Sequence, residues 1–321
     1  MPIPLLRSPL LVLDEVIKNI EIKQLFLLTL CSKRMHLIVK TLRDKSKQLV
    51  LKLLEDHGTV SLFLVEDYKN HLVLRVRAMP ESGLEGWTAD KYRGAVFQRK
   101  GLEIESYWEG LEEGTRCLLE HVSDLFSVQV QSVHSHSNSL WILDLVEELQ
   151  GPRSYEAFCT NTRITDEQLR HLLVDLNPTS LDLSWQSSHQ FRIEKFHKTY
   201  ETLSGQFGDW MSGKNLLTLD CVRLITHYKM FTATEINRFL RHVLIEGGAP
   251  RLTEFRSLLD NADANEILDG IREVLKPIEQ FEDNIFFWKF SALFDRGGRL
   301  AMVSIVCHKE SVTFFQLRIG Q

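Results

Sequence analysis

The first 46 residues carry apolar side chains at helical spacing in three short runs. In the first run, residues at every third or fourth position share one face: Leu13, Val16, Ile17 and Ile20. Pro9 precedes this run, and its fixed φ and missing N–H suit the first turn of a helix. Similar stripes over residues 25–31 and 35–42 predict two more helices. Because three helices this short cannot bury all of their leucines, we expect apolar surface to remain for a partner.

The next stretch, residues 47–114, has a different pattern. Residues 60–65 and 72–76 are rich in β-formers, and the polar residues 67–71 between them predict a hairpin. Residues 79–95 then collect proline and glycine, which is typical of loops. We expect a β-rich and loop-rich connecting region here.

From residue 115 helical stripes alternate with short runs of β-formers. Helices are predicted over residues 118–126, 140–149, 166–176, 234–244 and 264–275. Strands are predicted to start near residues 128, 155, 180, 216 and 251. This spacing lies in the period range of a β/α solenoid of the leucine-rich type, although it is irregular.

Two helix starts within this region resemble each other. Thr165 is followed three residues later by Gln168, and Thr232 is followed three residues later by Glu235. Each pair predicts a capping box, and apolar residues follow at the same offsets in both copies. Two interpretations are open: the two segments are copies of an internal repeat, or ordinary helix starts resemble each other by chance.

The last part of the chain has three β-rich runs, residues 284–294, 299–307 and 311–319. The Gly297-Gly298 pair between the first two runs suits a tight turn, so we expect an antiparallel segment that closes the end of the solenoid. The predicted fold is therefore α/β: a small helical module over residues 1–46, then an irregular leucine-rich-like β/α region over 115–321 with a C-terminal antiparallel β segment.

Charge is distributed unevenly along the chain. Residues 1–50 hold nine Lys or Arg against four Asp or Glu, a net charge of +5, and the remaining residues carry −10. A basic head on an acidic body favours an acidic protein partner for the head. Nucleic acid is not expected as a partner, because the basic residues are not interleaved with stacking aromatics.

The cysteines and the apolar runs bear on the cellular compartment. The five cysteines are scattered and form no C-x-x-C pair, which argues against a disulfide framework and for a reducing compartment. No secretory signal pattern begins the chain, and no stretch approaches the ~18 apolar residues that a membrane span needs. We expect a soluble protein of the cytoplasm, the nucleus or both, with no membrane partner.

Catalytic signatures are missing from the sequence. It contains no phosphate-binding glycine loop, no nucleophile elbow and no H-E-x-x-H zinc motif. His134 and His136 are the nearest approach to a metal pair, but zinc needs more ligands than they supply, and a solvated loop is the simpler interpretation. Cys221 lies in an apolar strand and is expected to be buried rather than nucleophilic. We therefore expect no catalytic residue, no metal and no cofactor.

The six tryptophans are the remaining candidates for a binding surface. Trp141 and Trp288 lie in periodic apolar segments and are expected in the core. Trp185, at the end of a predicted strand, and Trp210 are the candidates for exposed anchors that contact a protein substrate.

Two parts of the chain resemble a known family. Residues 4–16, PLLRSPLLVLDEV, together with the later tetrapeptide CSKR at residues 31–34, resemble the F-box of the large nematode F-box families. Residues 216–252, with LTLDC and the EGGAPRL turn, are similar to the type-2 F-box-associated region. The resemblance covers about 40 residues at the start and about 60 residues near 195–260.

The resemblance implies a role for each part. An F-box over residues 1–46 would dock on the Skp-type adaptor of a cullin-based ubiquitin ligase, and residues 115–321 would hold a protein substrate. The residues that would form or support the docking face are Pro4, Leu5, Leu6, Pro9, Leu10, Val12, Leu13, Val16, Ile17, Leu25 and Leu28. Ser8 stands where relatives have leucine, and Glu21-Ile22 where many have Asp-Pro, so weaker docking is expected.

The sequence thus favours a non-catalytic substrate receptor of a ubiquitin ligase. One alternative is an interaction scaffold of the leucine-rich type whose F-box has lost docking. A small-molecule enzyme built on the β/α region is the other, and it lacks any paired acid and base or nucleotide motif.

Overall fold

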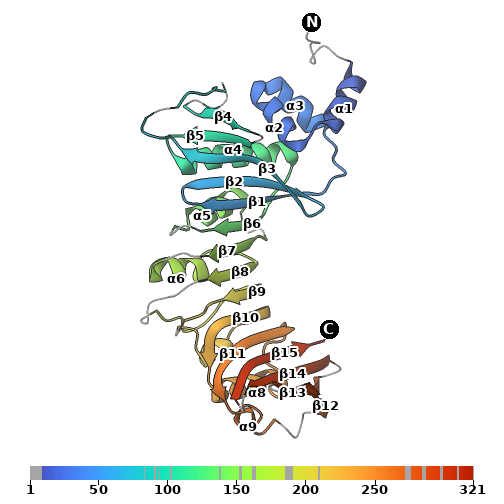
Figure 1. Ribbon diagram of the computed structural model, residues 1–321, viewed down its shortest axis with the longest axis vertical. Helices are drawn as coiled ribbons and strands as arrows, with labels where there is room; N and C mark the ends of the chain where they lie inside the picture. The colour runs from blue at the N-terminus through green and yellow to red at the C-terminus, as the bar shows by residue number, and fades with distance from the viewer. Residues whose placement is uncertain are drawn as a thin grey trace. The chain divides into compact units, whose positions relative to one another are not determined.

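The computed structural model describes most of the chain. The described residues are 9–82, 84–89, 92, 94–101, 103–136, 139–151, 154–160, 164–184, 191–208, 210–271, 276–283, 287–296, 299–308 and 311–320. The chain divides into two compact units, Met1–Tyr155 and Glu156–Gln321 (Figure 1). Both units are mixed α/β, which agrees with the predicted fold class.

The first unit joins a helical module to a mixed sheet. Its helices are α1 (Leu10–Asn19), α2 (Ile22–Cys31), α3 (Lys33–Leu42), α4 (Leu111–Phe126) and α5 (Trp141–Gln150). Its strands are β1 (Leu49–Asp56), β2 (Thr59–Glu66), β3 (Lys69–Ala78), β4 (Val96–Lys100), β5 (Glu103–Trp108) and β6 (Val130–Ser135). Within this unit the strand order is β6-β1-β2-β3-β5-β4. The three predicted short helices are confirmed as α1, α2 and α3.

Two tight turns shape the first sheet. β1 and β2 are joined through His57 and Gly58, and β2 and β3 through Asp67 and Tyr68. All four residues have positive φ, as two-residue hairpins of type I′ require. The predicted hairpin over 60–76 is confirmed, with a shorter loop because Lys69 already pairs with Glu66.

The second unit combines a parallel and an antiparallel part. Its helices are α6 (Asp166–Val174), α7 (Gly213–Leu216), α8 (Ala233–Leu244) and α9 (Ala264–Ile267). The strands β7 (Glu156–Thr160), β8 (Ser180–Ser184), β9 (Thr199–Gly205), β10 (Asp220–Phe231) and β11 (Glu254–Ala262) are parallel neighbours in chain order. The strands β12 (Lys276–Asp283), β13 (Phe287–Arg296), β14 (Arg299–His308) and β15 (Ser311–Ile319) form an antiparallel meander, and β15 pairs with β11. The predicted C-terminal antiparallel segment is confirmed.

Both predicted capping boxes are present. The Thr165 hydroxyl accepts a hydrogen bond from the Gln168 backbone N–H, and the Gln168 side chain accepts one from the Thr165 backbone N–H. Thr232 and Glu235 make the same reciprocal pair at the start of α8. These contacts satisfy N–H groups that a helix start leaves unpaired.

The structure corrects three expectations about organisation. The predicted boundary at residue 115 moves to residue 155, because β6 pairs with β1 and α4 packs against β3 and β5. β1 and β9 were not predicted as strands. Of the helix predicted over 264–275, only residues 264–267 are helical as α9, residues 268–271 form a turn, and residues 272–275 lie outside the described residues.

Within the described ranges, no helix is both long and apolar enough to span a bilayer. The same part of the chain holds no group of three or more His, Cys, Asp or Glu side chains that could bind a metal ion.

Candidate functional site

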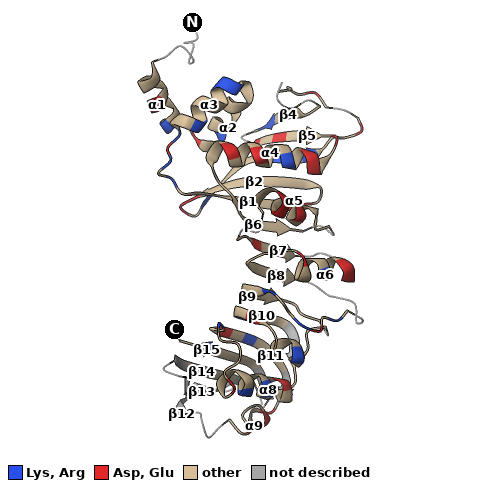
Figure 2. Cartoon of the chain, turned by 180° about the vertical axis from the view of Figure 1, so that it is seen from behind, with Lys and Arg blue, Asp and Glu red and all other residues tan. Residues whose placement is uncertain are grey.

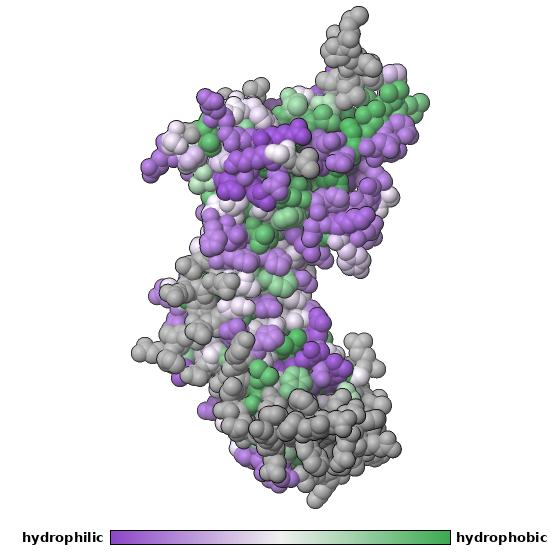
Figure 3. All heavy atoms as spheres, in the orientation of Figure 1, coloured by the Kyte–Doolittle hydropathy of each residue, from purple (hydrophilic) through white to green (hydrophobic). Residues whose placement is uncertain are grey.

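An apolar ridge projects from the first turn of α1. It consists of Leu10, Leu11 and Val12, whose exposed fractions are 67%, 81% and 49%. Pro9 is the N-cap of the helix and is exposed as well. In the space-filling view this part of the first unit is a continuous hydrophobic patch (Figure 3). We call Leu10, Leu11 and Val12 the α1 ridge.

The predicted docking residues fall into three groups. Pro9, Leu10 and Val12 are exposed, while Val16 and Leu28 are half-buried. Leu13, Ile17 and Leu25 are buried inside the module, so they can support a docking face but cannot contact a partner. Pro4, Leu5 and Leu6 lie outside the described residues. Leu11 was missed because the docking residues were taken from the family resemblance, and Leu11 was not among them.

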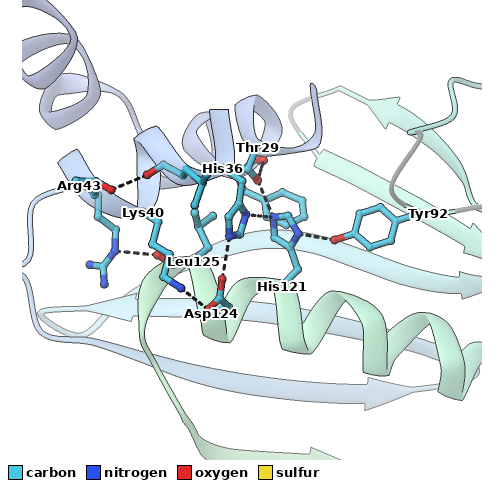
Figure 4. Close-up of polar contacts among 11 residues, drawn as sticks. Thr29, His36, Lys40, Arg43, Tyr92, His121, Asp124 and Leu125 are labelled. Carbon is cyan, nitrogen blue, oxygen red and sulfur yellow. Dashed lines mark hydrogen bonds and ion pairs between the residues drawn. The ribbon is translucent and has the colours of Figure 1, made fainter. Parts of the chain in front are cut away.

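A buried polar network joins the helical module to α4 (Figure 4). Thr29 on α2 donates its hydroxyl hydrogen to the Phe26 carbonyl, so its oxygen is left to accept from Nε2 of His121 at 2.7 Å. Nδ1 of the neutral His121 ring then accepts from the Tyr92 hydroxyl. Burial raises the pKa of Tyr92, which keeps this hydroxyl protonated and able to donate.

Two residues of α3 extend this network to Asp124 on α4. Nε2 of His36 donates to the Asp124 carboxylate at 2.9 Å, and Lys40 pairs with the other carboxylate oxygen. Nδ1 of His36 lies 3.4 Å from Nε2 of His121, so the His121 proton is shared between Thr29 and His36. Hydrogen bonds from Lys40 and then His36 lower the pKa of Asp124. The carboxylate is therefore ionised and holds α3 against α4.

Arg43, directly after α3, caps the C-terminal end of α4. Its Nε donates to the Leu125 carbonyl at 2.9 Å, and its terminal nitrogen donates to the Phe126 carbonyl. Only 8% of Arg43 is exposed, and its guanidinium lies 5.9 Å from the Phe126 ring centroid. A cation at this position satisfies carbonyls that the helix leaves unpaired and complements its dipole. The helical module is thus fixed to the sheet of the first unit through α4.

The tryptophan predictions have different outcomes. Trp210 is only 1% exposed, and its ring packs edge-on against Phe191 and Phe207. The prediction of Trp210 as an exposed substrate anchor is therefore wrong, because these phenylalanines close over the indole. Trp185 lies outside the described residues. Trp87, which was not singled out, is 40% exposed and stacks on Phe97.

The comparisons with known proteins address the second unit. Residues 188–257, which run from before β9 into β11, match the family model described as F-box associated. The second unit contains an F-box-associated region. No curated protein and no solved structure matches the chain. The match supports the resemblance predicted for residues 216–252.

Several buried or hydrogen-bonded side chains stabilise the F-box-associated region. Glu235, besides closing the capping box, accepts from the Gly213 backbone N–H at 2.8 Å and so links α8 to α7. Asn215 is buried and donates to the Ile193 carbonyl at 2.6 Å. Cys221 is 3% exposed, and burial raises the pKa of its thiol to about 12. A thiol that remains protonated is a core residue rather than a nucleophile.

A polar hollow of about 390 Å³ lies at the starts of β8 and β9. Arg251, one of its lining residues, is already paired with Glu201 and approaches Asp220 at 3.7 Å. Because two carboxylates balance the Arg251 charge, this side chain adds little attraction for an anionic ligand.

Proposed function

We propose that this chain is a non-catalytic substrate receptor of a cullin-based ubiquitin ligase. The α1 ridge would contact a Skp-type adaptor, and the second unit would hold the protein substrate. The F-box-associated region supports this proposal, because such regions accompany F-box modules in ligase receptors. The proposed place of action is the cytoplasm, the nucleus or both.

The α1 ridge is the observation that carries the adaptor proposal. Three consecutive residues span about 200° around a helix axis, so no single contact with the core can cover all of them. Burying one such side chain in a partner is worth about 1.5–3 kcal/mol. The ridge therefore offers a strong apolar contact to a partner, while the supporting residues Leu13 and Ile17 fix α1 from beneath.

Charge supports the same kind of partner. The first 50 residues, which include the ridge, carry a net charge of +5. An acidic adaptor would be steered toward such a surface, and the apolar ridge would then provide most of the binding free energy.

The proposed mechanism needs no chemistry from this chain. A receptor that holds its substrate near an activated ubiquitin raises the effective concentration of the two reactants. This agrees with the buried state of Cys221 and with the expectation of a protein that is not an enzyme.

Capture of a purified Skp-type adaptor by the full chain tests the proposal. We expect Leu10→Ser combined with Leu11→Ser to reduce capture by at least tenfold, since about 1.4 kcal/mol corresponds to a factor of ten. Val174→Ser combined with Ile245→Ser is the matched control, because these residues are 48% and 50% exposed in the second unit. Equal capture by both double variants would exclude the α1 ridge as the docking surface. No capture by the wild type would favour an interaction scaffold that has lost docking.

A further inference from the structure

One face of the sheet in the second unit carries exposed polar and apolar side chains. Phe255 on β11 points toward α8, where its ring centroid lies 5.0 Å from that of Phe239. Because successive strand residues point to opposite faces, Glu254 and Arg256 lie on the other side. We call this side of β9, β10, β11 and β15 the open face.

The strand register places the open-face residues in rows. Thr202, Arg223, Glu254 and Arg318 are consecutive partners across β9, β10, β11 and β15. Ser204, Ile225, Arg256 and Gln316 form the next row, and Leu258 pairs with Phe314 in a further row. Neighbouring strands are about 4.8 Å apart, so each row is a line of side chains across the sheet.

Two arginines on this face pair with one carboxylate, and a third lies next to it in the same row. Glu254 accepts from Arg256 at 2.7 Å and from Arg318 at 3.3 Å. Burial alone would raise the pKa of Glu254, but these hydrogen bonds outweigh it, and the pKa lies below its usual range. Arg223 is exposed and donates to the hydroxyl of Thr202 at 3.1 Å.

The open face therefore has a surplus of positive charge. Among the row residues of β9, β10, β11 and β15, three arginines stand against one carboxylate, Glu254, while Asp182 on β8 and Glu156 on β7 lie farther along the rows, beyond these strands. Figure 2 shows basic residues on this part of the second unit. The whole chain has a net charge of −5, so the arginines on this face stand out against an acidic protein.

Apolar side chains lie beside the arginines. Leu258 is 37% exposed, and Ile225 and Phe314 are half-buried on the same face. The phosphate backbone of a nucleic acid would be repelled by Glu254, which lies between the arginines. It also has no apolar groups to pack against the apolar residues of the face. An extended peptide with carboxylates and aliphatic side chains fits both features.

We propose that the open face binds an extended acidic segment of a protein. Carboxylates of the segment would pair with Arg223 and Arg318, and its apolar side chains would cover Leu258 and Phe314. The assignment of this segment to a ligase substrate rests on the proposed function. The binding of an acidic segment to the open face is independent of it.

Selection from a displayed library of random twelve-residue peptides, with the full chain as bait, tests the proposal. We expect the enriched peptides to combine Asp or Glu with aliphatic residues. In fluorescence anisotropy, Arg223→Glu combined with Arg318→Glu should weaken the best peptide on the order of tenfold or more. Its affinity should also fall with added salt. Lys195→Glu combined with Arg238→Glu is the control, since it makes the same change of charge at exposed residues outside the open face.

Several results would overturn the proposal. These are the absence of enriched peptides, enrichment of basic or neutral ones, and equal loss of affinity in the control. Tighter binding of a labelled single-stranded twelve-nucleotide RNA, lost in the Arg223 and Arg318 variant, would assign the face to nucleic acid. The adaptor capture described above is measured on the same variants. If the chain binds the adaptor but no acidic peptide, only the proposal for the open face is wrong. If it binds an acidic peptide but not the adaptor, only the receptor proposal is wrong.

Discussion

Nε2 of His121 on α4 lies 2.7 Å from the hydroxyl oxygen of Thr29 on α2, a residue 92 positions earlier in the chain. This hydrogen bond is buried and continues to Tyr92 on one side and to His36 on the other (Figure 4). The helical module is therefore packed into the first unit and is not a separate domain on a linker.

Replacement of His121 by phenylalanine should loosen this junction. The ring contact with Phe26, now at 5.5 Å between centroids, can persist, but the hydrogen bonds of His121 to the Thr29 oxygen and from the Tyr92 hydroxyl are lost. We expect a loss of about 2 kcal/mol, because two buried hydrogen bonds are removed and each contributes about 0.5–1.5 kcal/mol. Hydrogen exchange should show faster exchange in α2 and α3. His197→Phe, at an exposed residue of the second unit, should leave these helices unchanged, and equal protection in both variants would contradict the prediction.

Glu105 provides a prediction about pH. Its side chain is 3% exposed and pairs with Lys100 at 2.7 Å and Arg77 at 3.1 Å. Burial alone would raise its pKa, but hydrogen bonds from Lys100 and Tyr107 and the charge of Arg77 lower it on balance. A lowered folded-state pKa gives stability that is present above the unfolded value of about 4.3 and is lost as pH falls through the folded value.

The measurement compares Glu105→Gln with the wild type by urea unfolding between pH 7 and pH 3. At pH 7 the variant should be less stable by about 2 kcal/mol, and the difference should shrink as the pH falls below about 4. Glu109→Gln, another acidic residue of the first unit, serves as the control. A difference that grows on acidification would show that Glu105 is not stabilised as a carboxylate.

Gly114 in α4 has no room for an added methyl group. A Cβ at this position would overlap the indole ring of Trp108, which is 6% exposed on β5. Gly114→Ala should destabilise the first unit by about 1–2 kcal/mol, since the clash exceeds the gain in helix propensity. At Gly110, the N-cap of α4, the nearest atom would be 3.8 Å away, so Gly110→Ala should cost only the weaker capping by alanine, roughly 0.5 kcal/mol. Thermal unfolding of both variants checks this difference, and equal shifts would contradict it.

The capping box at Thr232 supplies a test within the F-box-associated region. Thr232→Ala removes the acceptor of the Glu235 N–H and should cost about 1 kcal/mol. Thr232→Ser keeps the hydroxyl and should restore most of this loss. Hydrogen exchange at the first turn of α8 distinguishes the two variants, and identical exchange in both would rule out a role for the cap.

Local chemistry explains which elements could be predicted. The helices α1 to α3 follow from apolar residues at three- and four-residue spacing, and the starts of α6 and α8 follow from Thr165 and Thr232. The C-terminal strands follow from β-rich runs separated by turn residues. All of these signals lie within a few residues of the element that they specify.

The missed features depend on residues that are distant in the sequence. β1 has leucines at positions that also suit a helix, and its strand conformation depends on pairing with β2 and β6. Trp210 was expected at the surface because Phe191, one of the two phenylalanines that cover it, lies in a different segment of the chain. The match of His121 with Thr29 has no local signal at all. The α1 ridge could be suspected from the surplus of leucines, but only the structure separates Leu11 from the buried Leu13.

The cap that Arg43 places on α4 has a consequence for motion in solution. Since the residues after α3 are tied to the Leu125 and Phe126 carbonyls, α3 has little freedom to swivel about the link to β1. Backbone amides of α3 and of β1 to β3 should therefore share one rotational correlation time in NMR relaxation. A protein bound to the α1 ridge would tumble together with this sheet as a single particle.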